Sequence, residues 1–499
     1  MSLLSGQFAR AERRGIWLGM EKFEIWIAVG GMLLAVVVAS NTPMPGGFFA
    51  AVFIVILAAL IVLPRVRGDS LVAWVRRFAK FRIAEFTGQN EFVYSMQEVE
   101  EMSRRSSSKT DMEQFWLALP GGGAAIEVFE MVDGTAMIYD AKRQRAGFVV
   151  RLRSEGFALA NEEEQESRVQ AFSQVMAGFS AHPGVARVQI LDRTVVQPPA
   201  DMLSAFEEAA AKSNHVSLAD PFAEIAYKEL LARASQLTFH EQFMTVMLST
   251  RALKDQIFAL GGGLEGIAAS LETEMRALPQ DLTRAGAKVE NYLTPRELAA
   301  VIRGAFDPDS ATDVAARRGD FAGVSPESAG PMGAMRRWDR LATDGVLHQT
   351  FIISEWPRRQ VLAGFLHPLI FAGEFRHTVT LVAEPINVAK AMKAVDSARQ
   401  DYESMENIRR GMKVRPSSKH AAILDDLDAR EGDLLDGHGE VRFAGLITIT
   451  ADDEAGLAAG RAELQHAAAR SMVEIRLAYG QQYEAFLASA VPLGLGLEQ

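Results

Sequence analysis

The chain has 499 residues, a formal net charge of −11 at pH 7 and no cysteine. Its length allows a membrane anchor and two or three further modules, and the lack of cysteine excludes disulfides, thiolate nucleophiles and cysteine metal sites. The charge is uneven, because residues 1–85 carry ten Lys or Arg and five Asp or Glu, which leaves −16 for the remainder. Direct nucleic-acid binding by this acidic remainder is therefore not supported.

Two long apolar stretches near the N-terminus dominate the pattern. The first runs from Phe23 to Ser40 and the second from Phe48 to Leu63, each close to the roughly 17–25 residues with which a helix crosses a bilayer. The turn between them contains two prolines, two glycines and no charge. The sequence therefore predicts a transmembrane helical hairpin over residues 21–64. The alternative is a hairpin buried in a soluble core, but such helices need a polar face, which neither stretch has.

Basic residues flank the two apolar stretches and are absent from the turn between them. Because positive residues are retained on the cytoplasmic side of a membrane, we expect a cytoplasmic N-terminal tail (residues 1–20) and a cytoplasmic C-terminal body. The protein would then be a multi-pass protein of the inner (plasma) membrane with both termini inside. The flanking basic residues are Arg13, Arg14, Lys22, Arg65, Arg67, Arg76, Arg77, Lys80 and Arg82.

Residues 65–88 form a basic amphipathic juxtamembrane segment. Between Leu71 and Phe86, apolar residues that include Trp74, Phe78 and Phe81 alternate with arginines and a lysine. At about 100° per residue this pattern gives a helix with an apolar face beside a basic face. Two interpretations stay open, a helix lying on an anionic membrane surface and a helix packing on the soluble part of the protein.

Residues 89–309 are expected to form a first cytoplasmic α/β region, in which short runs rich in Val, Ile, Phe and Tyr alternate with helical patterns. The predicted strands are Phe115–Leu119, Ala125–Met131, Gly134–Asp140, Phe148–Ser154 and Val185–Asp192. The predicted helices are Glu162–Gly178 and a long helical stretch, Pro198–Ala277, that includes Thr238–Leu260 and continues into Leu264–Leu278.

A further helix has clear start signals. Thr294 is the expected N-cap, Pro295 occupies the first helical position and Glu297 completes a capping box. The helix is expected to end near Ala305. Residues 310–335, rich in Gly, Ala, Ser and Pro, are expected to form a surface loop or an interdomain linker.

Residues 336–499 are expected to form a second cytoplasmic α/β region. Its long, charged excursion over residues 388–436 is predicted to be a helical hairpin that projects from the sheet. The fold class is thus α+β or α/β, with mixed sheets in the two regions. The other predicted elements are the strands His348–Glu355, Phe375–Glu384, Glu440–Thr450 and Phe486–Pro492 and the helices Arg359–Phe371 and Asp453–Tyr479.

The sequence offers no recognisable catalytic, cofactor or metal motif. Gly261–Gly266 fits the spacing GxGxxG, but it follows a helical pattern instead of a strand, so a helix-breaking loop is expected. No Gly-Lys-Ser or Gly-Lys-Thr occurs, so a Walker phosphate-binding loop is absent. His240 and Glu241 begin like a zinc-protease helix, but Met244 stands where the second histidine is needed. We therefore expect no cofactor, no metal and no enzyme activity.

Five segments resemble a family of actinobacterial membrane proteins with two N-terminal transmembrane helices. They read YLTPRELAAVIRGAFDP (292–308), HQTFIISEWPR (348–358), RHTVTLVAEPI (376–386), EVRFAGLITITADD (440–453) and IRLAYGQQYEAFLASAVPLG (475–494). Members are typically encoded beside PrgI-like small membrane subunits and type IV secretion ATPases of conjugative elements. The same segments resemble, more distantly, the N-terminal domain of those ATPases, without the motor domain that would follow.

The resemblance implies a non-enzymatic inner-membrane scaffold subunit of a type IV secretion or conjugation machine, which docks a separate translocation ATPase. The implied partners are the membrane, this ATPase, small polytopic PrgI-like subunits and further copies of the chain. No catalytic residue is implied, because the matched positions are structural in that family. The alternatives are a membrane core subunit of a type VII-like secretion system and a membrane-bound enzyme with an unrecognised site. The matched positions include Thr294, Pro295, Glu297, Leu298, Trp356, Pro357, Glu384, Pro385, Gly480 and Pro492.

Overall fold

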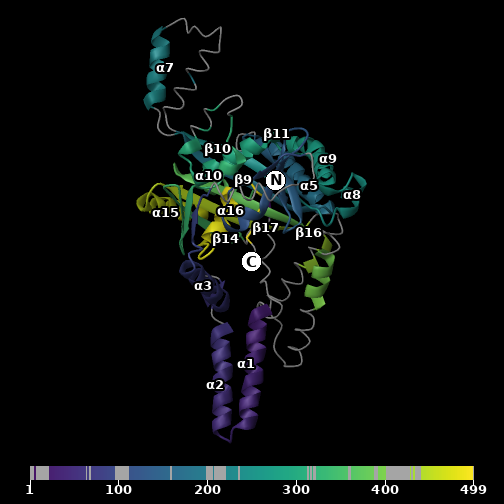
Figure 1. Cartoon of the computed structure of the whole chain (residues 1–499), viewed down its shortest axis with the longest axis vertical. Coiled ribbons are helices and arrows are strands. Elements are labelled where there is room, and N and C mark those ends of the chain that lie inside the picture. The colour runs from purple at the N-terminus through teal and green to yellow at the C-terminus, as the bar shows by residue number, and fades with distance from the viewer. Residues whose placement is uncertain are drawn as a thin grey trace.

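A computed structural model of the chain shows apolar helices at one end and a sheet-centred body at the other (Figure 1). It describes residues 5–6, 22–62, 65–66, 69–95, 112–154, 156–157, 160–197, 206, 221–233, 237–311, 314, 317, 322–357, 361–386, 391–400, 427–428, 431–432 and 440–497.

The helices and strands have the following bounds. The helices are α1 (Lys22–Asn41), α2 (Gly46–Val62), α3 (Leu71–Phe86), α5 (Glu162–Ala181), α7 (Pro221–Arg233), α8 (Lys254–Ala259), α9 (Gly263–Arg284), α10 (Pro295–Phe306), α12 (His367–Ile370), α15 (Glu454–Arg470) and α16 (Gln482–Ala490), with 3₁₀ turns η1 (Gly121–Ala125) and η4 (Pro326–Ser328). The strands are β1 (Ser5–Gly6), β2 (Arg65–Val66), β3 (Asp69–Ser70), β4 (Glu91–Val93), β5 (Gln114–Trp116), β6 (Ile126–Glu130), β7 (Ala136–Asp140), β8 (Arg145–Ser154), β9 (Val185–Gln197), β10 (Leu237–Ser249), β11 (Ala287–Tyr292), β12 (Gly333–Arg336), β13 (Leu341–Thr343), β14 (Val346–Glu355), β15 (Val361–Leu362), β16 (Arg376–Ile386), β17 (Glu440–Ala451) and β18 (Glu474–Leu477).

One 14-stranded sheet runs through both predicted regions. Its order is β4-β12-β13-β14-β17-β16-β9-β10-β8-β7-β6-β5, with β11 beside β8 and β18 beside β14. The pairings within it are antiparallel, so the expectation of mixed sheets is wrong. The regions meet where β9 pairs with β16 from Val188↔Ala383 to Thr194↔His377. This pairing satisfies backbone groups that two separate sheets would leave open at their edges.

Helices cover both faces of the sheet. On one face, α5 and α9 pack over a core that includes Phe148 and Val188, and α15 covers the strands further along. On the other face, α10 and α16 meet through Phe306 and Phe486, whose ring centroids lie 5.0 Å apart. The middle strands are thus buried on both sides, which is where long apolar runs are expected in a sheet.

The C-terminal segment after α16 is held against the sheet by buried polar side chains. The amide of Gln189 on β9 donates to the carbonyls of Ala488 and Val491 at 3.1 and 2.9 Å and accepts from the N–H of Gly494 at 2.8 Å. The Thr245 hydroxyl on β10 donates to the Pro492 carbonyl at 3.0 Å. A segment without strand partners therefore keeps its backbone hydrogen bonds satisfied inside the protein.

Several predicted elements differ from the structure. Thr238–Leu260 is not one helix, because it contains the strand β10 followed by the short helix α8. Residues 243–248 of β10 are buried on both faces, and a continuous apolar run of this kind fits either period. For the same reason, the predicted strand Phe486–Pro492 is wrong, since most of it belongs to α16.

Two further helices are shorter than predicted. Asp453–Tyr479 divides into α15 and the strand β18, with Met472 at φ +55° in the turn between them. The described part of Arg359–Phe371 contains the short strand β15 and the four-residue helix α12. Most of the helical hairpin predicted over 388–436 lies outside the described residues. Within this range, the described residues 391–400 are helical.

Several other local predictions agree with the structure. The Thr294 hydroxyl accepts from the N–H of Glu297, and the Glu297 carboxylate accepts from the N–H of Thr294 at 2.9 Å, which is the predicted capping box of α10. This helix ends at Phe306, one residue after the predicted end. The strands expected at Gly134–Asp140, Val185–Asp192 and Glu440–Thr450 are present as β7, β9 and β17, and the helix expected at Leu264–Leu278 is α9.

A buried histidine joins three elements on the α10 side of the sheet. The Thr343 hydroxyl donates to the Phe306 carbonyl at 2.8 Å, so it accepts from Nε2–H of His348 at 2.7 Å. The Nδ1 atom, 2.9 Å from the Thr450 hydroxyl, is then left to accept. Complete burial lowers the pKa of His348 from 6.5 to about 3, so the ring is neutral in the folded protein.

Replacing this histidine should change how stability depends on pH. The unfolded chain binds a proton at His348 below about pH 6.5 and the folded chain does not, so its contribution is lost as the pH falls from 6.5 toward 3. We expect His348→Gln to be less stable than wild type at pH 7. The difference should narrow by about 1.4 kcal/mol per pH unit below pH 6.

This expectation can be measured by denaturant unfolding of the full chain in mild detergent, followed by tryptophan fluorescence between pH 4 and 7. His466→Gln, at an exposed position of α15, is the matched control. A stability difference between wild type and His348→Gln that stays constant over this range would contradict the assignment.

Candidate membrane anchor and its junction with the body

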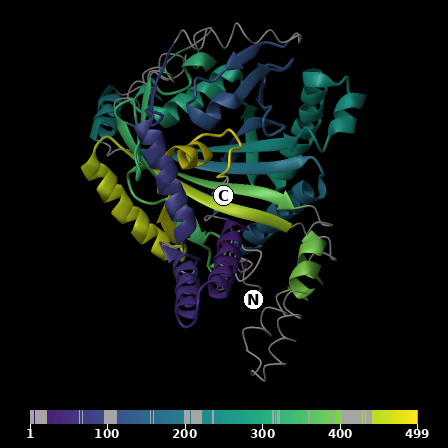
Figure 2. The same cartoon turned by 60° about the horizontal axis from the view of Figure 1, so that its bottom comes forward.

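The apolar helices α1 and α2 lie side by side and project from one end of the body (Figures 1 and 2). Among the described residues, α1 is the helix that is long and apolar enough to cross a membrane, with mean hydropathy 1.7 over Glu24–Asn41. The apolar part of α2, Gly46–Leu60, is shorter. Large apolar side chains point outward from both helices, with Trp26 74% and Phe49 68% exposed.

The helices α1 and α2 contact each other closely, and side chains satisfy carbonyl groups at the end of α1. A Cβ added at Gly31 would lie 2.8 Å from the Cβ of Ala58, so glycine allows the backbones to approach. At the end of α1, Asn41 Nδ2 and the Thr42 hydroxyl donate to the carbonyls of Val37 and Val38. These bonds satisfy carbonyls that a helix end leaves open, a requirement that is strongest in a lipid environment.

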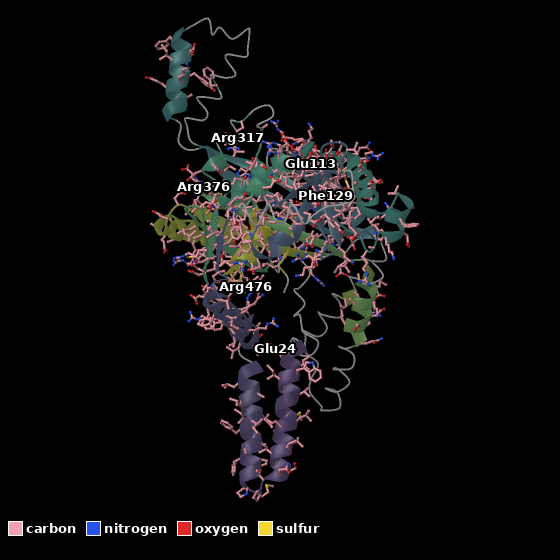
Figure 3. The ribbon with its side chains drawn as sticks, viewed as in Figure 1. Glu24, Glu113, Phe129, Arg317, Arg376 and Arg476 are labelled. Atoms are coloured by element: carbon pink, nitrogen blue, oxygen red, sulfur yellow. The ribbon has the colours of Figure 1, made fainter. Side chains whose placement is uncertain are left out.

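The predicted flanking basic residues are only partly described. Arg13, Arg14 and Arg67 lie outside the described residues, while Lys22 begins α1 and Arg65 lies in β2. The remaining four lie on α3: Arg76, Lys80 and Arg82 are exposed, and Arg77 is partly buried. In Figure 3, Glu24 lies at the end of α1 nearest the body, on the same level as the lower end of α3.

The helix α3 connects the apolar helices to the sheet. Ser70 caps it by accepting from the N–H of Ala73 at 3.1 Å, and the turn after Phe86 leads directly into the edge strand β4. This strand pairs with β12, and the Asn90 carbonyl accepts from the N–H of Arg336 at 2.8 Å. The chain therefore passes from α2 to the sheet edge through α3.

Aromatic side chains hold α3 against the body. Trp338, between β12 and β13, packs edge-to-face on Trp74, Phe78 and Phe81, with ring centroids 5.7, 5.4 and 5.3 Å away. Their spacing along the sequence places the three α3 rings on one face of the helix. Such pairs add to the stabilisation that comes from burying the ring surfaces. Tyr479 also packs against Trp338, with ring centroids 6.3 Å apart.

Gly480 makes this aromatic cluster possible. Its φ is +70°, which favours glycine, and an added Cβ would lie 2.3 Å from Cζ3 of Trp338. Its N–H donates to the Trp338 carbonyl at 2.8 Å. A side chain at this position would therefore clash with the indole and disturb its packing on α3.

The other positions with family-like motifs are spread over the sheet and do not meet in one site. Leu298 is a fully buried residue of α10, Trp356 and Pro357 follow β14, with Trp356 packed against the core under α15, and Pro385 pairs with Val441 near the end of β16. Their places agree with a structural role for these residues. Only Gly480 belongs to the junction.

Glu384 forms a charged cluster on β16. It accepts from Nε of Arg187 at 3.1 Å, and Nη1 of Arg187 donates to the Gly494 carbonyl at 3.1 Å. Burial raises the pKa of Glu384, but the hydrogen bond and charge of Arg187, together with Arg145 and Arg442, outweigh burial and lower it. The cluster fixes the C-terminal segment on the sheet.

The described residues do not contain a group of three or more His, Asp or Glu arranged for a metal ion. Gly261–Gly266 follows α8 and begins α9, which confirms the predicted helix-breaking loop. A shallow pocket of about 240 Å³ lies beside it, lined by residues that include Tyr139 and Lys254. We take the junction between the apolar helices and the body as the candidate site.

The sequence predicts the amphipathic helix over Leu71–Phe86 but does not reveal its contact with Trp338 or the part played by Tyr479. The only signal was the spacing of Trp74, Phe78 and Phe81 along one helix face. This spacing shows that the rings face one partner without showing which partner it is. The sequence matches no protein-family model, and no curated protein matches it.

Replacing Gly480 should weaken the junction. We expect Gly480→Ala to lose about 1–3 kcal/mol of stability from the positive φ and the displaced indole, with a changed Trp338 fluorescence. Gly88→Ala is the matched control, because Gly88 also has φ +70° but an added Cβ there meets nothing within 4 Å. Equal effects of the two variants, measured by denaturant unfolding of the full chain, would show that contact with Trp338 contributes nothing.

Proposed function

We propose that the chain is a membrane-anchored scaffold subunit of a type IV secretion or conjugation machine. In this proposal α1 and α2 both cross the inner membrane, and the sheet-centred body lies in the cytoplasm. The single observation that supports it most is the pair of exposed apolar helices that project from one end of the body and connect through α3 to the sheet edge (Figure 1).

A second observation supports the proposed topology, in which α1 and α2 cross the membrane and return. Ser5 and Gly6 of the N-terminal tail pair with Leu362 and Val361 of the body as β1 and β15. The tail before α1 and the body after α2 therefore lie at the same end of the helix pair. A helix pair that crosses a bilayer and returns would have this arrangement, with the turn around Met44 on the far side.

The scaffold role rests on the resemblance of the five segments to the N-terminal domain of secretion ATPases. These segments supply the neighbouring strands β14, β17 and β16 and the helices α10 and α16, which meet through Phe306 and Phe486. A translocation motor needs a fixed point on the membrane before its movement can displace a substrate. A body joined to two membrane helices through a packed aromatic cluster would supply that fixed point without catalysing a reaction itself.

The topology predicts opposite labelling of two sites. Because the chain has no cysteine, single cysteines can be placed at Met44, which is 81% exposed in the α1–α2 turn, and at Val132, which is 98% exposed in the body. A membrane-impermeant maleimide should label Met44→Cys in cells whose outer layers are permeable. It should label Val132→Cys only after the inner membrane is opened.

Equal labelling of both sites before the inner membrane is opened would contradict the topology. Failure to label Met44→Cys under any condition would place α1 and α2 inside a protein core instead of a bilayer. Labelling of both single-cysteine proteins in detergent serves as the positive control.

The scaffold role predicts specific partners. Affinity purification of the full chain from native membranes in mild detergent should recover a secretion-type ATPase and small polytopic membrane subunits, identified by mass spectrometry. An ATPase with one motor domain would support the type IV assignment. An ATPase with tandem motor domains would instead assign the chain to a type VII-like secretion system. An ATPase that sediments with membranes equally well without this chain would contradict the docking role.

A further inference from the structure

The helix α3 has a second apolar stripe that the aromatic cluster does not use. Trp74, Phe78 and Phe81 face Trp338, whereas Val75, Ile83 and Phe86 point away from it. Their side chains are 51%, 63% and 94% exposed. At 100° per residue, these three positions fall within about 80° of one another on the side of the helix opposite Trp74.

Basic side chains border this outer stripe on both sides. On the same helical projection, Arg82 lies next to Val75 at one border, and Arg76 and Lys80 lie beyond Ile83 at the other. Arg76 and Lys80 are exposed and form no ion pair within the part of the chain that the structure describes. Arg82 contacts Glu85 at 2.5 Å, but both side chains are about half exposed or more, at 62% and 49%, so this pair costs little to replace.

The helix α3 lies at the end of the body from which the apolar helices project. Figure 2 shows α3 crossing the side of the body from which α1 and α2 project, instead of continuing the direction of α2. Only the residues between Val62 and Leu71, including the paired strands β2 and β3, separate α3 from the end of α2. If α2 crosses a bilayer, α3 begins at the bilayer surface.

We propose that the outer face of α3 binds anionic lipid headgroups of the membrane leaflet in which α2 ends. Val75, Ile83 and Phe86 enter the boundary between headgroups and acyl chains, and Arg76, Lys80 and Arg82 contact lipid phosphates. The inner face stays on Trp338, so α3 lies between the lipid surface and the body. Both interpretations of residues 65–88 then hold at once, one for each face. This inference rests on the proposed membrane anchoring.

The experiment uses the full chain, in nanodiscs, with an environment-sensitive fluorophore (NBD) on single cysteines. Ile83→Cys and Phe86→Cys report the outer face, and Val132→Cys reports a remote exposed position. We expect a blue shift and a rise in NBD emission at the two α3 positions in nanodiscs of phosphatidylcholine with phosphatidylglycerol. The response should be smaller in phosphatidylcholine alone and should diminish at high salt. Val132→Cys should not respond.

Charge variants test the basic borders. Arg76→Gln combined with Lys80→Gln should reduce the difference between anionic and neutral nanodiscs at Ile83→Cys. Lys142→Gln combined with Lys254→Gln, which removes two exposed charges elsewhere on the body, should leave it unchanged. If both pairs of substitutions reduce the difference between anionic and neutral nanodiscs equally, the effect is one of general charge, and the proposal is overturned.

Two further results would overturn the inference while leaving the anchor intact. NBD emission at Ile83 and Phe86 that matches Val132 in every lipid would show that the outer face stays in water. Emission that is blue-shifted to the same degree in neutral and anionic nanodiscs would show that protein covers the face. Incorporation of the chain into nanodiscs, measured on the same samples, tests the anchor separately.

Discussion

The contact between Trp338 and the inner face of α3 is the constraint on which the arrangement of this protein depends. Packing of one indole against three rings at 5.3–5.7 Å fixes the direction of α3, the helix that connects the apolar helices to the sheet. The same indole also contacts Tyr479, and the Gly480 N–H donates to the Trp338 backbone carbonyl. Because β4 and β12 pair beside it, the apolar helices are connected to the sheet by both backbone and side chains.

The large antiparallel sheet gives this junction a rigid base. Strands from the two halves of the chain meet at its centre, where β16 pairs with β9. A force applied at α3 would therefore pass through β4 and β12 into strands that are buried on both faces. The buried polar contacts of Gln189 and Thr245 with the C-terminal segment add a further restraint on one face. Such a body is suited to holding a partner in a fixed position relative to a membrane.

The sequence predicted local features well and long-range pairing poorly. The capping box of α10 was predictable because Thr294, Pro295 and Glu297 act within one turn. Strand β10 was mistaken for a helix because its apolar residues, among them Phe243 and Met247, are buried on both faces and repeat at four-residue spacing. The pairing of β9 with β16 has no local signal at all. The contact between α3 and Trp338 could not be predicted for the same reason, although the amphipathic helix itself was predicted.

The most direct test of the account measures whether Trp338 fixes the direction of the helix pair. Spin labels on Leu60→Cys, exposed near the end of α2, and Val132→Cys, exposed in the body, would give a distance distribution by pulsed electron resonance in nanodiscs. The account predicts a narrow distribution for the otherwise wild-type chain and a broad one when Trp338→Ala is added. A distribution that is equally broad with and without Trp338 would contradict it.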